Sequence, residues 1–347
     1  MKNIVYILAL CLLASCSKDD TGYVATPTPV ELEIPANFPD IKYNLSGNPL
    51  TKEGIELGKS LFYDGRLSSN GVVSCGFCHE QAFSFTHHGH SVSHGVNGEV
   101  GFRNSQPLHN LAFYEEFTWD GAAIHLDLQP IIPITSEVEM NETIPGVLTK
   151  LRSNKMYQKM FKNAFGDSEI NSERMLKALS QFMITMISGN SKYDKHIRDE
   201  GISLTQQELE GLDLFNSKCA SCHQGELFTD QSYKNNGLPL NNQFPDEEGR
   251  KRVTGNPNDF YKFRVPSLRN VALSFPYMHD GRFGTLQDVL DYYDSGMVDN
   301  GNVDPSLLRE DGSFGITLSE SEKKQIISFL KTLTDNEFIQ NKDFAEY

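Results

Sequence analysis

Cys75-Gly76-Phe77-Cys78-His79 is repeated in kind at Cys219-Ala220-Ser221-Cys222-His223, and these two stretches decide how the chain folds. Each is a C-x-x-C-H motif, the attachment signal for a c-type haem. Two thiols three residues apart can bond the two vinyl-derived carbons on one porphyrin edge, and the adjacent histidine then reaches the iron. The motifs therefore predict two covalent haems, each bound by two cysteines and a histidine.

Two other readings compete for such cysteines, a thioredoxin-like redox pair and a zinc site. A thioredoxin-like pair needs a βαβ context, and neither motif has one. A zinc site would need further ligands beside each Cys₂His group. The spacing therefore favours haem at both positions.

The segments around the two motifs form a loose internal repeat. Residues 50–62 and 204–215 each begin with a threonine start signal, continue with helical apolar spacing and share a G-x-x-L-F ending. Each half also closes with an amphipathic pattern, at residues 175–186 and at residues 319–333, where Ser319 and Glu322 predict a capping box. We expect a mostly α fold of two tandem cytochrome c-type domains, each with one covalent haem.

The start of the chain is typical of an export signal. An apolar run at residues 4–13 follows Lys2 and ends in Leu13-Ala14-Ser15-Cys16, which resembles a lipoprotein signal sequence. An ordinary signal peptide with a stray cysteine is the alternative. The predicted organisation is a signal peptide at 1–15, a tether at 16–40 lipidated at Cys16, a first haem domain at 41–195 and a second haem domain at 196–347. Cys11 would be removed with the signal.

Composition narrows the class of partner. The 347 residues carry a formal net charge of −15, which argues against nucleic acid as a main partner because phosphates would be repelled. Hydrophobic residues make up 38% of the chain, so a folded body is expected. The acidic charge is a candidate docking surface for a basic protein.

A series of short motifs resembles one family. In order these are Arg103-Asn104, Trp119-Asp120-Gly121, Gln129, Glu139-Met140 and the segment from Pro276 to Gly281. Together with both haem motifs, they resemble the bacterial di-haem cytochrome c peroxidases and the related di-haem enzyme that matures the tryptophan-derived cofactor of methylamine dehydrogenase. The resemblance covers roughly residues 45–335. Ala122 departs from it, since arginine usually follows W-D-G.

The resemblance implies a role for each motif residue. The haem on His79 would be the peroxidatic one, with Glu139 above its open face as general acid–base and Gln129 positioning peroxide or water. The haem on His223 would transfer electrons, and Trp119 would lie between the two haems as a relay. The plain alternatives are a solvated surface carboxylate for Glu139 and a core aromatic for Trp119.

Other residues concern a calcium site and a further ligand for each haem iron. The resemblance implies calcium at Asn104 with the carbonyls of Ser274, where threonine is usual, and Pro276. His94 aligns with a histidine that caps the peroxidatic iron in resting peroxidases. Tyr293 falls where peroxidases carry a methionine and the cofactor-maturing relative carries a tyrosine. Alternatives remain open at both positions: His87, His88 or His90 for the first, and Met297, Met278 or no iron contact for the second.

The expected function is reduction of hydrogen peroxide to water with electrons from a small cytochrome or similar donor. The first alternative uses peroxide to oxidise a protein or organic substrate, and the second is a membrane-tethered electron carrier. The expected location is the periplasm or cell envelope, on a lipid anchor. The resemblance also admits a homodimer.

Overall fold

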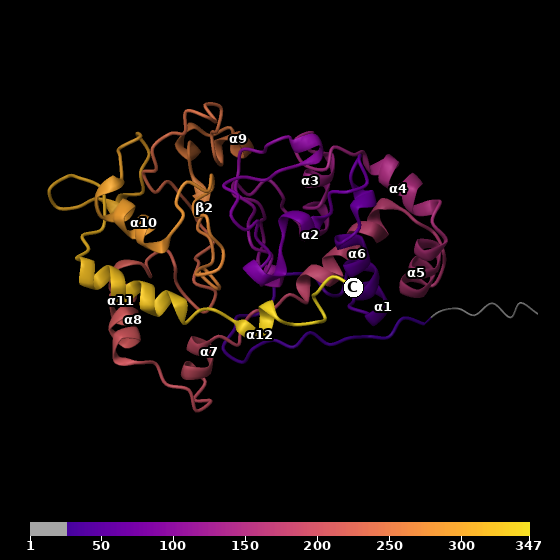
Figure 1. Ribbon diagram of the computed structural model, residues 1–347, viewed down its shortest axis with the longest axis horizontal. Helices are drawn as coiled ribbons and strands as arrows, with labels where there is room; N and C mark the ends of the chain where they lie inside the picture. Colours follow the sequence, from indigo (N-terminus) through magenta and orange to yellow (C-terminus); the bar gives the residue numbers. More distant parts are fainter. Residues whose placement is uncertain (1–25) are drawn as a thin grey trace, which may run out of the picture.

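The computed structural model describes residues 26–347, so the predicted signal peptide, Cys11 and the lipidation site Cys16 lie outside the described residues. The fold is mostly helical, as expected, and the described strands are limited to a short antiparallel pair, β1 (Tyr233–Lys234) and β2 (Phe263–Arg264). Figure 1 shows two lobes side by side. The helices are α1 (Lys52–Phe62), α2 (Cys75–Cys78), α3 (Ile131–Thr135), α4 (Ile144–Arg152), α5 (Lys155–Phe165), α6 (Ser172–Ile184), α7 (Lys192–Ile197), α8 (Gln206–Lys218), α9 (Lys251–Thr254), α10 (Leu286–Asp291), α11 (Glu320–Lys331) and α12 (Asn336–Ile339).

The first lobe is built around the pairing of α1 with α6. Thr51 accepts a hydrogen bond from the Gly54 amide and so caps the first turn of α1. Gly58 lets the two helices touch, because a Cβ there would lie 1.9 Å from the carbonyl oxygen of Ala178. Leu57 and Leu61 of α1 are buried in this core, as are Met175 and Met183 of α6. The amphipathic pattern of α6 therefore packs in the core.

The second lobe repeats this device with α8 and α11. Thr205 and Ser319 each form a capping box, so both predicted helix starts are confirmed. A Cβ on Gly211 of α8 would lie 2.0 Å from the carbonyl oxygen of Gln325 of α11. The helix before each haem motif therefore packs on its closing helix through a glycine in both halves.

The internal repeat includes loops that were not predicted from the sequence. Phe117 pairs with Ala123 across the W-D-G turn, and Tyr277 pairs with Phe283 in the same way across His279-Asp280-Gly281. Asn110 and Asn270 adopt left-handed backbone conformations (φ of 62° and 57°), are buried, and end the matching segments Leu-His-Asn and Leu-Arg-Asn. Each half therefore contains the same loop scaffold beyond its haem motif.

The segment between the two cores is ordered and partly buried. It spans the predicted division between residues 195 and 196 and contains α7, whose Asp194 forms a fully buried, bidentate ion pair with Arg269 at 2.8 and 2.9 Å. Ser188, fully buried, accepts a hydrogen bond from Asn110 and another from Asn270. The junction is therefore fixed from both halves.

The C-terminal residues return to the first lobe. Phe338 of α12 and Phe344 pack in the N-terminal core against Phe85, although the sequence division assigned them to the second domain. Figure 1 shows this crossing, with α12 between the lobes and the C-terminus beside α1 and α6. The last residues of the chain therefore bind the two halves together.

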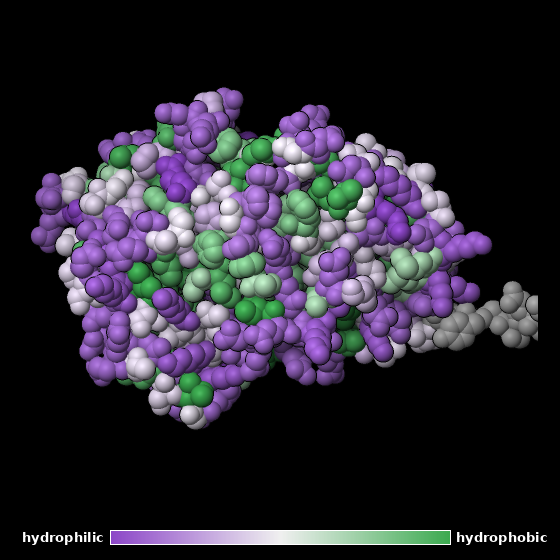
Figure 2. Space-filling view, viewed as in Figure 1, coloured by the Kyte–Doolittle hydropathy of each residue, from purple (hydrophilic) through white to green (hydrophobic). Residues whose placement is uncertain are grey.

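The visible surface is mainly polar. Figure 2 shows hydrophilic side chains over most of this face, with apolar groups gathered near its middle, where the lobes meet. Among residues 26–347, no helix is long and apolar enough to cross a membrane.

Candidate functional sites

The first C-x-x-C-H motif forms a short helix with its histidine held from behind. Cys75–Cys78 make up α2, and His79 follows as its C-terminal cap. The Nδ1 atom of His79 lies 2.7 Å from the carbonyl oxygen of Phe85, and since a carbonyl only accepts, the ring donates there. This tautomer leaves Nε2 as the basic nitrogen, the form that an iron ligand needs.

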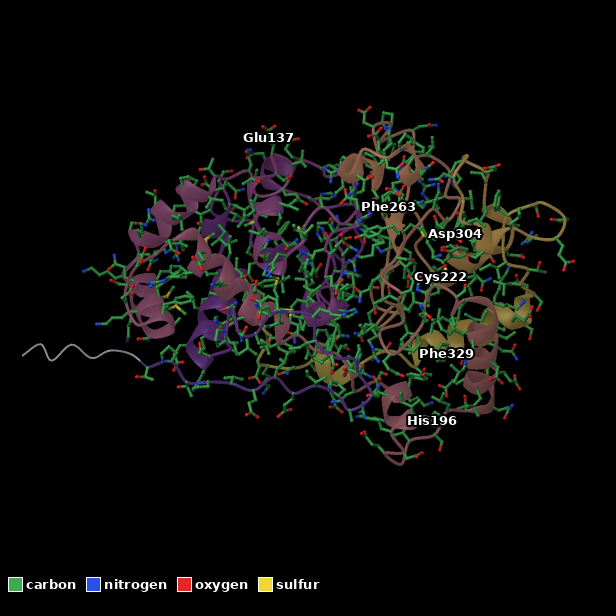
Figure 3. The ribbon with its side chains drawn as sticks, turned by 180° about the vertical axis from the view of Figure 1, so that it is seen from behind. Glu137, His196, Cys222, Phe263, Asp304 and Phe329 are labelled. Atoms are coloured by element: carbon green, nitrogen blue, oxygen red, sulfur yellow. The ribbon has the colours of Figure 1, made fainter. Side chains whose placement is uncertain are left out.

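The second motif orients its histidine in the same way and lies beside a cavity. His223 Nδ1 lies 3.2 Å from the carbonyl oxygens of both Phe228 and Pro266. Beside it is a cavity of about 220 Å³, lined by Cys219, Cys222, His223 and many apolar side chains. Figure 3 shows Cys222 inside the C-terminal lobe. An apolar cavity next to two thiols and an oriented histidine fits a covalently attached porphyrin.

The environment of three of the motif cysteines fits thioether attachment rather than thiol redox chemistry. Burial raises the pKa of Cys75, Cys78 and Cys219 to about 12 in each case. Reactive cysteines have lowered pKa values, because the thiolate is the nucleophile. Within residues 26–347, no three His, Cys, Asp or Glu side chains are grouped to hold a metal ion. The zinc and thioredoxin-like readings therefore gain no support.

Glu139 lies beside the first motif. Burial raises the pKa of its carboxyl, with a smaller opposing effect from a hydrogen bond to Ser93, and its charge in turn adds to the raised pKa of Cys78. Its backbone is fixed, since the Val96 amide donates to the Glu139 carbonyl at 2.7 Å. Glu137, two residues earlier, is exposed and points outward in Figure 3. The structure therefore brings together Cys78 and Glu139, the carboxylate chosen from sequence.

Gln129 and His94 lie on the segments that flank this site. Gln129 is half-buried in the turn that leads into α3, and the chain then continues to Glu139. The carbonyl of His94 accepts a hydrogen bond from Cys78 Sγ at 3.6 Å. The Nε2 atom of the His94 ring lies 3.4 Å from His90 Nδ1. His87 stacks on His90 at 4.2 Å between ring centroids. His87, His90 and His94 therefore form one cluster at the edge of the first site.

Trp119 lies at the contact between the lobes. Its Nε1 donates to the carbonyl of Asn104 at 2.9 Å, and its own carbonyl accepts from the Arg264 amide of the second lobe at 2.8 Å. Its side chain lines the cavity of the second motif. The first half therefore holds the indole and the second half holds the backbone of Trp119, beside the cavity of the second motif.

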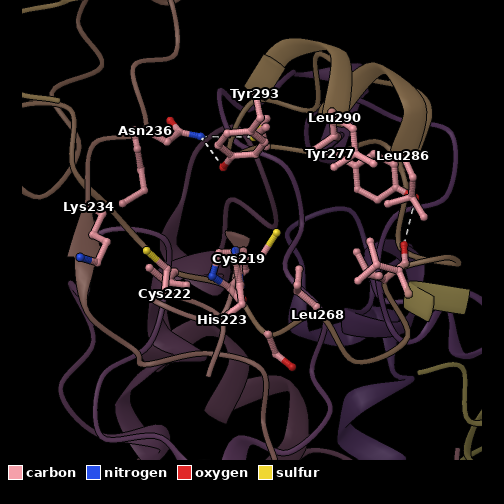
Figure 4. A pocket seen from close by; sticks show the side chains of 18 of the residues that line it. Cys219, Cys222, His223, Lys234, Asn236, Leu268, Tyr277, Leu286, Leu290 and Tyr293 are labelled. Atoms are coloured by element: carbon pink, nitrogen blue, oxygen red, sulfur yellow. Dashed lines mark hydrogen bonds between the residues drawn. The ribbon is translucent and has the colours of Figure 1, made fainter. Parts of the chain in front are cut away.

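Tyr293 faces the second motif across the cavity. Figure 4 shows its ring opposite Cys219, Cys222 and His223, with Asn236 Nδ2 donating to its hydroxyl at 3.1 Å. Tyr293 belongs to a π-helical turn (Tyr292–Gly296) that continues α10, a rare geometry that is frequent at functional sites. Burial raises its pKa to about 12.

Met278 and Met297, the two predicted alternatives to Tyr293, lie in different places. Met278 lines the cavity beside Tyr293, whereas Met297 is not among its lining residues and packs with Leu238 and Tyr261. Met278 Sδ accepts a weak contact from Asn236 at 3.7 Å. The geometry thus favours Tyr293 and Met278 over Met297 as groups that face the second haem site.

The expected calcium ligands lie on one wall of this cavity. Asn104, Ser274 and Pro276 all line it, and Asn104 is buried. The Asn104 amide nitrogen donates to the carbonyls of His90 and Ser91, which orients the side chain. Amide and carbonyl oxygens are the hard ligands that calcium prefers, so the residue set is compatible with that ion.

Comparison with known proteins decides the family. Residues 52–201 match the model of the di-haem cytochrome c peroxidase family. The methylamine utilization protein MauG of Methylorubrum extorquens is 37% identical over 295 residues, 82% of this chain and 79% of that protein. The cytochrome c551 peroxidase of Nitrosomonas europaea is 35% identical over 292 residues, 83% of this chain and 82% of that protein. The chain belongs to the di-haem cytochrome c peroxidase family.

A solved structure extends the likeness to the fold. A MauG-like protein associated with microbial copper homeostasis is similar with a TM-score of 0.80 and 32% identity, covering 91% of this chain and 99% of that one. The protein is therefore a di-haem peroxidase, an oxidoreductase, and the family implies two c-type haems. The resemblance drawn from the motifs is confirmed.

Some residues that hydrogen-bond to the predicted site residues were not predicted from the sequence. The carbonyls that accept from His79 and His223 include those of Phe85 and Phe228, each in a left-handed conformation (φ of 61° and 52°). A threonine follows each of these phenylalanines, and this repeated Phe-Thr pair marks the two positions in the sequence. Asn236 and Glu247, which hold Tyr293 and Arg103, had no signal at all, because their roles exist only in the folded contacts.

Proposed function

We propose that this di-haem peroxidase reduces hydrogen peroxide to water at the site of Cys75, Cys78 and His79. Reducing one peroxide to two waters takes two electrons and two protons. A haem bound by His79 and linked to both cysteines would supply the redox chemistry. The proposal includes the tandem plan of two cytochrome c-type domains, because each lobe carries its own motif, helix pair and oriented histidine.

Glu139 carries the proposal. A carboxyl that moves a proton between two peroxide oxygens works best when its pKa is raised toward the working pH, and burial raises the pKa of Glu139. Its position beside Cys78 supports a role at the edge of the first haem site. Gln129, which enters the turn before α3, would orient peroxide or water by hydrogen bonds.

The test replaces Glu139 with glutamine, which keeps the shape and removes the proton-transfer group. We expect Glu139→Gln to lower the peroxide-dependent oxidation of a reduced cytochrome at least about 100-fold, since general acid–base catalysis contributes that much. The exposed neighbour gives a matched control, and Glu137→Gln should keep full activity. Undiminished turnover in Glu139→Gln, with both haems bound, would show the assignment to be wrong.

A second function is favoured by Tyr293. Its hydroxyl faces the second haem site, and an oxygen ligand there would disfavour the ferrous iron relative to a thioether. This suits oxidation of a protein or organic substrate by peroxide without prior half-reduction. Reaction of the fully oxidised protein with peroxide favours this function, whereas reaction only after half-reduction favours the peroxidase with a cytochrome donor.

The partners and location follow from charge and sequence. The net charge of −15 supports a small basic electron donor, such as a cytochrome c, and predicts that its oxidation slows as salt rises. Calcium at Asn104, Ser274 and Pro276 would stabilise the lining of the cavity beside the second motif, which also includes Trp119. A lipid on Cys16 would hold the protein to a membrane in the periplasm or cell envelope. A homodimer is compatible with this arrangement.

A further inference from the structure

The two proximal histidines have unequal hydrogen bonds. His79 donates to the Phe85 carbonyl at 2.7 Å, whereas His223 lies 3.2 Å from each of two carbonyls, those of Phe228 and Pro266. A short bond to a single acceptor pulls the ring proton more strongly than a long bond shared between two. The ring of His79 is therefore the more basic of the two toward an iron.

Different side chains hold the two acceptor loops. In the first half, Ser84 Oγ lies 2.8 Å from His109 Nδ1, and Ser84 directly precedes the acceptor Phe85. Ser84, Phe85 and His109 are all at least 98% buried, and Ser84 and Phe85 are consecutive residues with positive φ (58° and 61°). Two such strained residues keep their conformation only when their surroundings fix them. His109 is the side chain that fixes this hydroxyl.

In the second half, Arg269 has the equivalent place. His109 and Arg269 are the middle residues of the matching segments Leu-His-Asn and Leu-Arg-Asn. The Nε of Arg269 donates to the Glu226 carbonyl at 2.6 Å, and Ser267 Oγ donates to the Leu227 carbonyl at 2.7 Å, both in the loop that leads to Phe228. The guanidinium is held in turn by Asp194. Each acceptor loop is thus held from the same position of the repeat.

We propose that His109 is a positioning residue for the peroxidatic iron, holding the Ser84–Phe85 turn so that the Phe85 carbonyl keeps its short bond to His79. Arg269 performs the matching task for His223 through a different contact. The chain thereby gives its two irons unequal proximal ligands from one repeated scaffold. This inference rests on the proposed assignment of His79 and His223 as iron ligands.

The expected consequence is a difference in the potentials of the two irons. A strongly hydrogen-bonded, more basic histidine stabilises the ferric state and lowers the reduction potential of its haem. Loss of the Ser84–His109 contact frees the turn, and the bond from His79 to Phe85 lengthens. The potential of the first haem should then rise, while that of the second haem stays where it is.

The test compares His109→Leu with His109→Gln in the full-length protein loaded with both haems. Redox titration followed by visible spectroscopy gives the two midpoint potentials, and resonance Raman of the reduced protein gives the iron–histidine stretch. His109→Leu should raise the potential of the first haem and lower that stretching frequency. His109→Gln, whose amide can still bond to Ser84, should restore both values toward those of the parent.

Two further variants keep the result decisive. Ser84→Gly removes the same hydroxyl at a positive φ that suits glycine, so it should fold and shift the first potential in the same direction as His109→Leu. His196→Leu, at a half-buried position of α7, should change neither potential. Unchanged potential and stretch in both His109→Leu and Ser84→Gly would overturn the inference. Loss of one bound haem in the parent would instead contradict the proposed function.

Discussion

Gly95 lets two chain segments approach each other where Glu139 is held. A Cβ on Gly95 would lie 2.2 Å from the Val138 carbonyl oxygen and 2.4 Å from that of Glu139. Real side chains do not tolerate such distances, so the backbone of Glu139 would have to move. Misplacement of a catalytic group by about 1 Å can cost on the order of 100-fold in rate, so we expect a side chain at Gly95 to lower activity by displacing Glu139.

We therefore expect Gly95→Ala to reduce turnover at least about 10-fold and to lower the free energy of unfolding by about 1–3 kcal/mol, the usual cost of overpacking. Peroxide-dependent turnover and urea denaturation measure the two effects. Gly284→Ala is the matched control, because a Cβ there meets no atom within 4 Å. Equal turnover in both variants would contradict the proposed placement of Glu139.

The geometry supports a direct test of Tyr293 as the predicted ligand of the second haem. Its ring faces Cys219, Cys222 and His223, and Met297 is not among the cavity-lining residues. We expect Tyr293→Phe to change the electron paramagnetic resonance signal of the second haem and Met297→Leu to leave it as it is. The reverse pattern would assign the ligand to Met297, and a change in neither variant would exclude both residues.

Single residues divide clearly into those that sequence could predict and those that it could not. Cys75, Cys78 and His79 follow from spacing, because the porphyrin edge dictates it. The carbonyl of Phe85 could not be predicted as the histidine's acceptor, since any residue carries a carbonyl and only the left-handed turn aims this one. Asn236 was missed for the same reason, as its contact with Tyr293 is made across 57 residues.

The capping box of α11 begins a helix that packs in the core of the second lobe. Ser319 Oγ accepts from the Glu322 amide, while the Glu322 carboxylate accepts from the backbone amide and hydroxyl of Ser319. Ser319→Ala removes one of these partners and should lower the free energy of unfolding by about 1 kcal/mol. Urea denaturation measures this, and Ser321→Ala, an exposed position inside the same helix, should leave stability nearly unchanged.

Elements whose signals are local were predicted, and elements formed by tertiary contacts were not. The helices α1, α6, α8 and α11 combine caps with apolar periodicity, so the chain itself marks where they lie. The helix α7 was missed because it has few apolar residues and exists around the buried pair of Asp194 and Arg269. The π-helical turn after α10 carries no pattern that a helical period would reveal.

At the scale of the whole molecule, a buried charge cluster joins the lobes. Arg103 lies 2.8 Å from Asp120 in the first lobe and makes two hydrogen bonds, of 2.7 and 2.8 Å, to Glu247 in the second. Arg252 of α9 also reaches Asp120, whose side chain is fully buried. Sequence offered the Arg103-Asn104 pair as a family signature, but its partner Glu247 lies 144 residues away. The arrangement of the two lobes could therefore not be read from local pattern.

This cluster predicts how stability depends on pH. Burial by itself would raise the pKa of Asp120, but Arg103 and Arg252 outweigh it and hold the pKa at about 2, below the ordinary 3.8. Because the folded-state value is the lower one, the ionised carboxylate stabilises the fold above about pH 4, and this contribution is lost as the pH falls toward about 2.

Asp120→Asn tests this, because it removes the titrating group and keeps the shape. The free energy of unfolding at pH 7 should fall on the order of 3 kcal/mol, since two guanidinium groups lose a buried partner. The variant should also lose stability less steeply than the parent as the pH falls from about 4 to about 2. Urea denaturation across this range, with the exposed Glu137→Gln as control, gives both quantities. Parallel curves for Asp120→Asn and the parent would mean that the lobes are joined mainly by their apolar contacts and the returning C-terminal residues.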